Sequence, residues 1–406
     1  MWKKYKICDI ATVLSGATPA TSDLANYDGE IVWITPKDLA LNNSKYISRG
    51  ERNLTEKGYK GCSTQLIPPY NILMSSRAPI GLLAINRTEC CTNQGFKNLV
   101  IDKSICDVDF FYYYLKYHIE EVQALGSGTT FKEVSKSSLQ SFVVSLPSLD
   151  EQKQIANILS TLDEKIALNR QINDNLEAMA RQLYDYWFVQ FDFPNEEGKP
   201  YKSSGGAMVW NEKLKREIPK EWNVANVFDE LSVQYGFPFS TELFTEEPTN
   251  IPIVRIRDIL ENSVSAYSEE DVDEKYKLQK QDLVIGMDGN FHMNYWNDNV
   301  SYLNQRSVRL RTKSKSTVSI MQAKYDIAPY IKAKELRAKG STVGHLSDKD
   351  LKELFVLVSP NTDFRNKFDS ILAEIIENRC AMKELTKQRD ELLPLLMNGQ
   401  ASVNSD

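Results

Sequence analysis

The sequence predicts an α+β protein with two similar mixed α/β globular units, each followed by a long helix, and with the two helices paired as a coiled coil. Three observations lead to this prediction. A heptad pattern occurs twice, short apolar strands alternate with turn residues ahead of each heptad run, and the two halves match at nearly constant offsets. A chain of 406 residues is long enough for about two to four domains of ordinary size.

The first globular unit is expected over residues 1–147. Apolar runs of strand length cover Glu30–Thr35, Asn71–Ser75 and Leu82–Ile85, and turn residues separate them. The longer apolar stretch Asp109–Leu125 favours a helix.

The first long helix is expected over residues 148–192. Ser148 and Glu151 form the S-x-x-E pattern of a capping box, and Pro194 closes the periodic run. Such a helix would be about 60 Å long at about 1.5 Å per residue, and a heptad stripe on so long a rod needs a partner helix. The 4-3 spacing places these residues on its seam: Ile155, Leu159, Leu162, Ile166, Asn169, Asn173, Leu176 and Leu183.

A surface linker is expected over residues 193–219, because Ser203–Gly206 and the prolines and charges around it are typical of a connection. The second globular unit is expected over residues 220–358. Its strand-like runs are Ile251–Ile256, Asp282–Ile285 and Ser307–Arg311.

The second long helix is expected over residues 359–398, followed by a tail over 399–406. Ser359-Pro360 offers a cap and a first-turn proline, and Asn398-Gly399 suits a left-handed end. Its heptad run superposes on the first at an offset of 209 residues. The seam residues here are Phe364, Phe368, Ile371, Ile375, Asn378, Met382, Leu385 and Leu392.

The segments ahead of the two helices match more loosely. Gly128 and Val134 fall on Gly340 and Leu346 at an offset of 212, while Leu39 and Leu260 match at 221. We interpret the small changes of offset as loop insertions.

Three seam positions are asparagines: Asn169, Asn173 and Asn378. Buried asparagine lowers coiled-coil stability but fixes the register of the helices. Either these residues set the register, or drift of the seam around the helix places them in water.

Taken alone, the net charge of −6 argues against nucleic-acid binding. However, most of the acidity lies in the helical segments 151–200 and 359–406, and the globular units are nearly balanced. The apolar runs are too short for a membrane span or a signal peptide, and six cysteines without C-x-x-C spacing suggest reduced thiols. We therefore expect a cytosolic protein with no membrane partner.

The sequence contains no convincing catalytic constellation. Ile67-Pro68-Pro69-Tyr70 resembles the N-P-P-Y element of adenine methyltransferases, but isoleucine cannot hydrogen-bond the target amino group. Gly126–Thr130 lacks the frame of a phosphate-binding loop, and three histidines with no paired cysteine ligands make a metal site improbable.

What remains is a pattern of binding. Arginine, lysine, asparagine, glutamine and serine, the types that contact base edges and phosphates, follow strand-like runs at matched places in both units. The same residue types also fill ordinary surface loops. The candidate DNA-binding residues are Lys37, Ser75, Ser76, Arg77, Asn93, Gln94, Lys97, Thr129, Thr130, Lys132, Arg255, Arg257, Asp288, Asn290, His292, Asn304, Gln305, Arg306, Ser341 and Thr342.

The order of these elements resembles the specificity (S) subunit of bacterial and archaeal type I restriction-modification systems over nearly the whole chain. The second junction, Val358–Asp363, departs from this pattern because it lacks the P-x-x-x-E-Q signature. The stretches that carry the resemblance are Ile72–Gly81, Thr92–Lys97, Leu146–Ile155, Tyr186–Pro194, Ser204–Gly206, Ile218–Trp222, Met287–Phe291 and Asn304–Arg306.

The resemblance implies a non-catalytic reader of double-stranded DNA. In that family two target-recognition domains flank an antiparallel two-helix spacer with pseudo-two-fold symmetry. The spacer docks two methyltransferase (M) subunits, and restriction (R) subunits join the full complex. The chain itself would bind no cofactor, while the partner methyltransferase would use S-adenosylmethionine, in the cytoplasm of a bacterium or archaeon.

Two half-sites near one DNA turn apart, about 34 Å, would fit such a rod. Two other readings stay open from the residues: a coiled-coil scaffold with two protein-binding heads, and a self-contained adenine DNA methyltransferase. Ile67 and the missing methyl-donor loop oppose the second of these.

Overall fold

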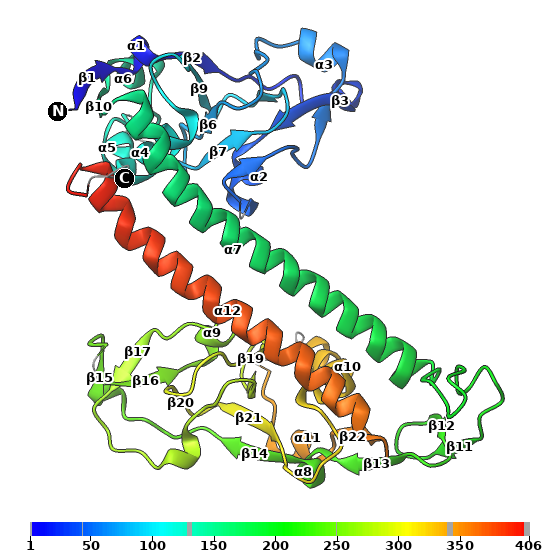
Figure 1. The fold of residues 1–406 in the computed structure, drawn as a ribbon. Helices are drawn as coiled ribbons and strands as arrows, with labels where there is room; N and C mark the ends of the chain where they lie inside the picture. Colours follow the sequence, from blue (N-terminus) through cyan, green and yellow to red (C-terminus); the bar gives the residue numbers. More distant parts are fainter. Residues whose placement is uncertain (1, 43, 128–131, 249, 339–343, 402–406) are drawn as a thin grey trace. The chain divides into compact units, whose positions relative to one another are not determined.

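The computed structural model describes residues 2–42, 44–127, 132–248, 250–338 and 344–401. The chain forms two compact units. Unit 1 is Met1–Leu168 with Lys383–Asp406, and unit 2 is Asn169–Met382. Each unit therefore combines a globular part with a portion of both long helices (Figure 1).

Unit 1 contains a five-stranded sheet in the order β2-β9-β6-β7-β4, a three-stranded sheet β5-β3-β8 and the pair β1-β10. Its strands are β1 (Lys3–Lys6), β2 (Ala11–Ser15), β3 (Tyr27–Ile34), β4 (Tyr46–Ile47), β5 (Asn53–Leu54), β6 (Ile72–Met74), β7 (Leu83–Asn86), β8 (Cys91–Thr92), β9 (Lys97–Ile101) and β10 (Val143–Leu146). Its helices are α1 (Ile7–Ile10), η1 (Leu24–Asn26), α2 (Pro36–Leu41), α3 (Glu56–Lys60), α4 (Val108–Tyr117), α5 (Ile119–Ala124), α6 (Lys136–Ser141) and the first part of α7 (Leu149–Tyr184).

Unit 2 contains two four-stranded sheets, β14-β21-β18-β19 and β15-β17-β16-β20, and the pairs β11-β12 and β13-β22. Its strands are β11 (Met208–Asn211), β12 (Arg216–Pro219), β13 (Asn223–Asn226), β14 (Leu231–Tyr235), β15 (Phe244–Thr245), β16 (Ile251–Val254), β17 (Ala266–Ser268), β18 (Leu283–Gly286), β19 (Met293–Tyr295), β20 (Tyr302–Leu303), β21 (Ser307–Thr312) and β22 (Phe355–Val358). Its helices are η2 (Asp185–Val189), α8 (Val227–Glu230), η3 (Thr241–Leu243), α9 (Ile256–Ile259), η4 (Glu274–Tyr276), α10 (Ile320–Ala338), α11 (Asp348–Lys352) and most of α12 (Thr362–Met397).

The two globular parts repeat one topology. The antiparallel set β2-β9-β6 corresponds to β14-β21-β18, and the parallel pair β3-β8 corresponds to β16-β20. The capping boxes of α2 and α9 align Asp38 with Asp258, which pairs buried Leu39 with buried Ile259. The match of Leu39 with Leu260 is therefore wrong by one residue, and Leu260 is exposed.

The two long helices run antiparallel within each unit. In unit 1, Asp163 in the first half of α7 pairs with Arg389 in the second half of α12, at 2.8 Å. In unit 2, Glu177 pairs with Arg379 at 3.0 Å. The seam residues predicted from the heptads are all buried or half-buried, because each 4-3 step returns a side chain to the same helix face.

The helix ends differ from the expected ones in two places. Helix α7 passes into the π-helical turn η2 and stops at Val189. Helix α12 begins at Thr362, where Asn361 Oδ1 accepts the main-chain N–H of Asp363 at 2.9 Å. Ser359 instead accepts the N–H of Asn361 and holds the turn before the helix, since Pro360 lies outside it.

The segment expected to be a surface linker is folded in the structure. It contains the β11-β12 hairpin, and Phe193 and Ile218 are buried in the core of unit 2. The ring of Phe193 stacks on that of Trp222, with centroids 5.0 Å apart. Gly198 and Gly205 do adopt positive φ in exposed turns, as the composition suggested.

Asparagine side chains join the two helices in unit 2. Asn378 Nδ2 donates to Asn173 Oδ1 at 3.0 Å, and Asn173 Nδ2 donates to the carbonyl of Ile375 at 3.1 Å. Asn173 is buried, whereas Asn169 is half-buried. We expect replacement of both Asn173 and Asn378 by leucine to raise resistance to urea but to lose the single register, because leucine packs equally well at neighbouring heptads.

Urea unfolding would measure the first effect, and disulfide cross-linking between single cysteines placed on the two helices would measure the second. Asn366→Leu, at an exposed position of α12, is the matched control and should change neither. A leucine pair that keeps one register would show that the asparagines do not set it.

Candidate nucleic-acid interface

The loop between β8 and β9 and the loop between β20 and β21 occupy the same place in their units. The main-chain N–H of Asn93 donates to the carbonyl of Ile34 at 3.1 Å. In the second unit, the main-chain N–H of Asn304 donates to the carbonyl of Val254 at 3.1 Å. Gly16 and Gly236 pass beneath these loops, where a Cβ atom would collide with the carbonyl oxygen of Asn93 or Asn304. Glycine is thus required for the loops to pack closely on β2 and β14.

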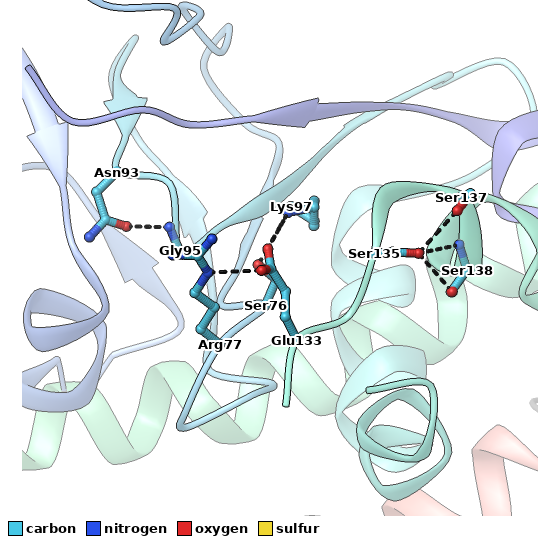
Figure 2. Close-up of polar contacts among 9 residues, drawn as sticks. All are labelled: Ser76, Arg77, Asn93, Gly95, Lys97, Glu133, Ser135, Ser137 and Ser138. Atoms are coloured by element: carbon cyan, nitrogen blue, oxygen red, sulfur yellow. Dashed lines mark hydrogen bonds and ion pairs between the residues drawn. The ribbon is translucent and has the colours of Figure 1, made fainter. Parts of the chain in front are cut away.

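In unit 1 a carboxylate joins two cations beside this loop. Glu133 Oε2 accepts from Arg77 Nε at 3.0 Å, and Glu133 Oε1 accepts from Lys97 Nζ at 3.0 Å (Figure 2). Burial opposes ionisation of Glu133, but the hydrogen bond and charge of Lys97, and then those of Arg77, leave its pKa below the ordinary value. Glu133 is therefore ionised near neutral pH and binds both cations.

The cations of this cluster differ in exposure. The Arg77 side chain is 48 % exposed, whereas that of Lys97 is only 9 % exposed. Lys97 also donates to the hydroxyl of Ser76 at 3.4 Å. Of these two cationic side chains, only that of Arg77 is accessible to an external ligand.

Several other candidates in unit 1 have structural roles. Ser75 is buried; its hydroxyl donates to the carbonyl of Pro79 and accepts the N–H of Leu82 at 2.8 Å. Ser76 is buried as well. Asn93 Oδ1 caps its own turn through the N–H of Gly95 (Figure 2). The buried serines are thus part of the scaffold of the interface.

Besides Arg77, the described candidates of unit 1 that are exposed are Lys37, Gln94 and Lys132. Lys37 forms a 2.6 Å ion pair with Glu51, and this hydrogen bond raises the pKa of Lys37. The side-chain oxygen of Gln94 accepts a hydrogen bond from Thr18. These side chains lie where an external ligand can reach them.

In unit 2 the carboxylate is Asp288. Its Oδ2 accepts from Arg306 Nη1 at 2.6 Å, and its Oδ1 lies 2.6 Å from His345 Nδ1. Burial opposes ionisation of Asp288, but the hydrogen bonds from His345 and then Arg306 leave its pKa below the ordinary value. Arg306 has φ +66° and a 69 % exposed side chain, so it projects from the loop.

The remaining described candidates in unit 2 divide in the same way. Arg257, Asn290 and Gln305 are exposed, while His292 and Asn304 are half-buried. Arg255 is half-buried and donates to the carbonyl of Ser265 at 2.7 Å, which fixes the start of α9. Thr129, Thr130, Ser341 and Thr342 lie outside the residues that the structure describes.

Comparison with known proteins decides the family of the chain. Residues 1–178 and 219–393 each match the family of type I restriction modification DNA specificity domains. The chain belongs to this family. It carries two specificity domains, in agreement with the repeat found in the sequence.

Relatives of this chain are named as type I specificity subunits. The MjaIX specificity subunit of Methanocaldococcus jannaschii is 32 % identical over 418 residues, covering 99 % of this chain and 94 % of that protein. The EcoBI specificity subunit of Escherichia coli is 26 % identical over 187 residues, which is 44 % of this chain and 37 % of that protein. A crystal structure of the S subunit from M. genitalium has the same fold, with a TM-score of 0.61, 16 % identity and coverage of 100 % of this chain and 97 % of that one.

The specificity domains contain two functional candidates that the sequence did not single out, Glu133 and His345. They lie 56 and 57 residues from their partners Arg77 and Asp288 along the chain, so no local motif connects them. The offset of 212 that aligns Gly128 with Gly340 would have placed Glu133 on His345. This alignment of the two halves was the one feature of the sequence that could have pointed to Glu133 and His345 as matched residues.

The methyltransferase-like tetrapeptide is a structural turn in this specificity subunit. Ile67 is buried, and the hydroxyl of Tyr70 donates to Asp109. Asn71 Nδ2 donates to the carbonyls of Pro68 and Pro69 at 3.0 and 3.3 Å. The carbonyls of Pro68 and Pro69 and the hydroxyl of Tyr70 are thus all used in hydrogen bonds within the chain.

Within the described ranges, no group of three or more His, Cys, Asp or Glu residues could hold a metal ion. Within the same ranges, no helix is long and apolar enough to cross a membrane.

Proposed function

We propose that the chain is the non-catalytic DNA-recognition subunit of a type I restriction-modification complex, in which each specificity domain reads one half of a bipartite target. The single observation that carries this proposal is the repeated interface. The same polar loop and carboxylate cluster are built twice on one strand order, with different side chains at matched positions. A duplicated scaffold with different contact residues fits a reader of two different half-sites.

The boundaries of the two target-recognition domains are proposed at residues 1–147 and 220–358. The paired helices between them would set the spacer length and dock two methyltransferase subunits, since the repeat offers each M subunit an equivalent surface. Restriction subunits would join this core. S-adenosylmethionine would belong to the methyltransferase, and the complex would act on double-stranded DNA in the cytoplasm.

The ion pairs of the interface bear on how tightly the chain binds alone. Lys37, Arg77 and Arg306 are each paired with a carboxylate of the same unit. Phosphate binding would have to compete with these pairs, and a net charge of −6 opposes it further. We therefore expect the isolated chain to bind duplex DNA weakly and with strong salt dependence, and the complex with the M subunit to bind tightly.

A gel shift with duplex DNA, with and without co-expressed methyltransferase subunit, tests this expectation. Mapping of methylated adenines in cells that carry or lack the chain should reveal a bipartite sequence that depends on it. If neither preparation binds DNA and the methylation pattern does not change, the chain is better described as a scaffold with two protein-binding heads.

A further inference from the structure

A carboxylate that holds an exposed arginine recurs at the same structural position in both units. In unit 1 the backbone of Arg77 bridges that of Glu133, and in unit 2 that of Asp288 bridges His345. The flanking bonds correspond as well: Val134 N–H donates to Ser76 at 2.9 Å, and Leu346 N–H donates to Met287 at 2.7 Å. The two ion-pair clusters are therefore repeats of one feature.

The carboxylate changes place between the repeats. In unit 1 the strand-end residue is the cation Arg77 and the returning segment supplies Glu133. In unit 2 the strand-end residue is Asp288 and the returning segment supplies His345. Despite this exchange, each cluster keeps one carboxylate in contact with two nitrogen-bearing side chains, one of which is an exposed arginine.

Such a pair restricts what the arginine can do. A free arginine on the surface swings among rotamers and binds phosphates of any sequence, whereas a fixed guanidinium presents its planar donors in one orientation. The bond from Arg77 uses Nε, so a guanidinium held in this way can still direct its two terminal amino groups at the O6 and N7 atoms of guanine (Figure 2). Holding the side chain also reduces the rotamer entropy that is lost on binding.

We propose that Glu133 and Asp288 are positioning residues for base discrimination: each holds an exposed arginine, Arg77 or Arg306, in the orientation that reads a base of its half-site. This inference rests on the proposed function, since it assigns a role within the same interface. It predicts that loss of either carboxylate makes DNA binding stronger but less selective.

Neither carboxylate is needed to keep its loop in place. The main chain of Glu133 is bonded in both directions to Ser127, each at 3.1 Å. In unit 2, Gly289 N–H donates to the carbonyl of Gly344 at 2.9 Å. Glu133→Gln and Asp288→Asn keep the side-chain shape and remove one negative charge each, so they test the charge without a cavity.

The experiment uses the complex of the full chain with its methyltransferase subunit. Its Kd is measured for the cognate duplex, for duplexes changed in one half-site, and for random duplex DNA, over a range of salt. We expect Glu133→Gln to lower discrimination at one half-site about tenfold, to strengthen binding to random DNA and to steepen the salt dependence by about one phosphate contact. Asp288→Asn should do the same at the other half-site only.

Glu56→Gln in α3 is the control, because it removes the same charge from an exposed pair with Lys60 in unit 1. It should leave discrimination unchanged. Glu133→Asp, which keeps the charge, should restore most of the discrimination that Glu133→Gln loses.

Unchanged discrimination in both neutral variants would overturn the inference. Equal loss of affinity for all duplexes together with a lower melting temperature would also overturn it, since that is the result of a merely structural role. If instead the wild-type complex does not distinguish cognate from random DNA, it is the proposed function that fails.

Discussion

Insertion of seven residues into each long helix, after Leu168 and after Met382, is expected to lengthen the unspecified spacer of the DNA target by about three base pairs. Seven residues add about 10 Å at about 1.5 Å each, which is about three steps of B-DNA at about 3.4 Å. One full heptad keeps the seam residues of both helices in phase. Both half-site sequences should stay the same, and mapping of methylated adenines would read spacer and half-sites together.

The two insertion points fall at the division between the units. The Asp163–Arg389 pair belongs to unit 1, and the Asn173–Asn378 bond belongs to unit 2. An insertion after Leu168 and after Met382 therefore leaves the contacts inside each unit intact. A copy of the seven residues before each point preserves the heptad pattern.

The same seven residues inserted at Gly198 provide the control. Gly198 lies in an exposed turn, and a Cβ there would meet nothing within 4 Å. The complex of this variant with the methyltransferase subunit should methylate the original target. A helix-extended variant that keeps the original spacer, or that acquires new half-sites, would refute the role of the helices as a ruler.

The sequence predicted the long helices well because their signal is local. Each heptad step depends only on residues three or four positions away, and the copy at an offset of 209 doubles the signal. The segment 193–219 was predicted less well. Its glycines and serines do form turns, but Phe193 packs on Trp222, and that contact depends on tertiary structure.

The candidate interface shows the same limit. Residue type and position singled out loops that lie at matched places in the two units, and Arg77 and Arg306 in these loops are exposed. Type alone could not show that Ser75 is buried and used by the scaffold. Nor could it find Glu133, whose partner Arg77 is distant in the sequence and near only in the fold.

Replacement of Phe368 by alanine is expected to lower the free energy of unfolding of unit 2 by about 3–5 kcal/mol, because it empties a fully buried aromatic site. The ring of Phe368 lies 6.0 Å from that of Trp187 and 6.0 Å from that of Phe188. The seam of α12 is here also the core of the globular part, since Phe364 in the preceding seam position contacts Trp222.

Tryptophan fluorescence during urea unfolding would measure this effect. Four of the six tryptophans lie in unit 2, so the signal reports mainly on it. Lys367→Ala, at the exposed neighbouring position, should change the free energy by less than about 0.5 kcal/mol. A loss below about 1 kcal/mol for Phe368→Ala would show that the site collapses around the missing ring. A large loss would mean that a heptad residue supports the second recognition domain directly, so that the spacer helix and the domain it carries cannot be destabilised separately.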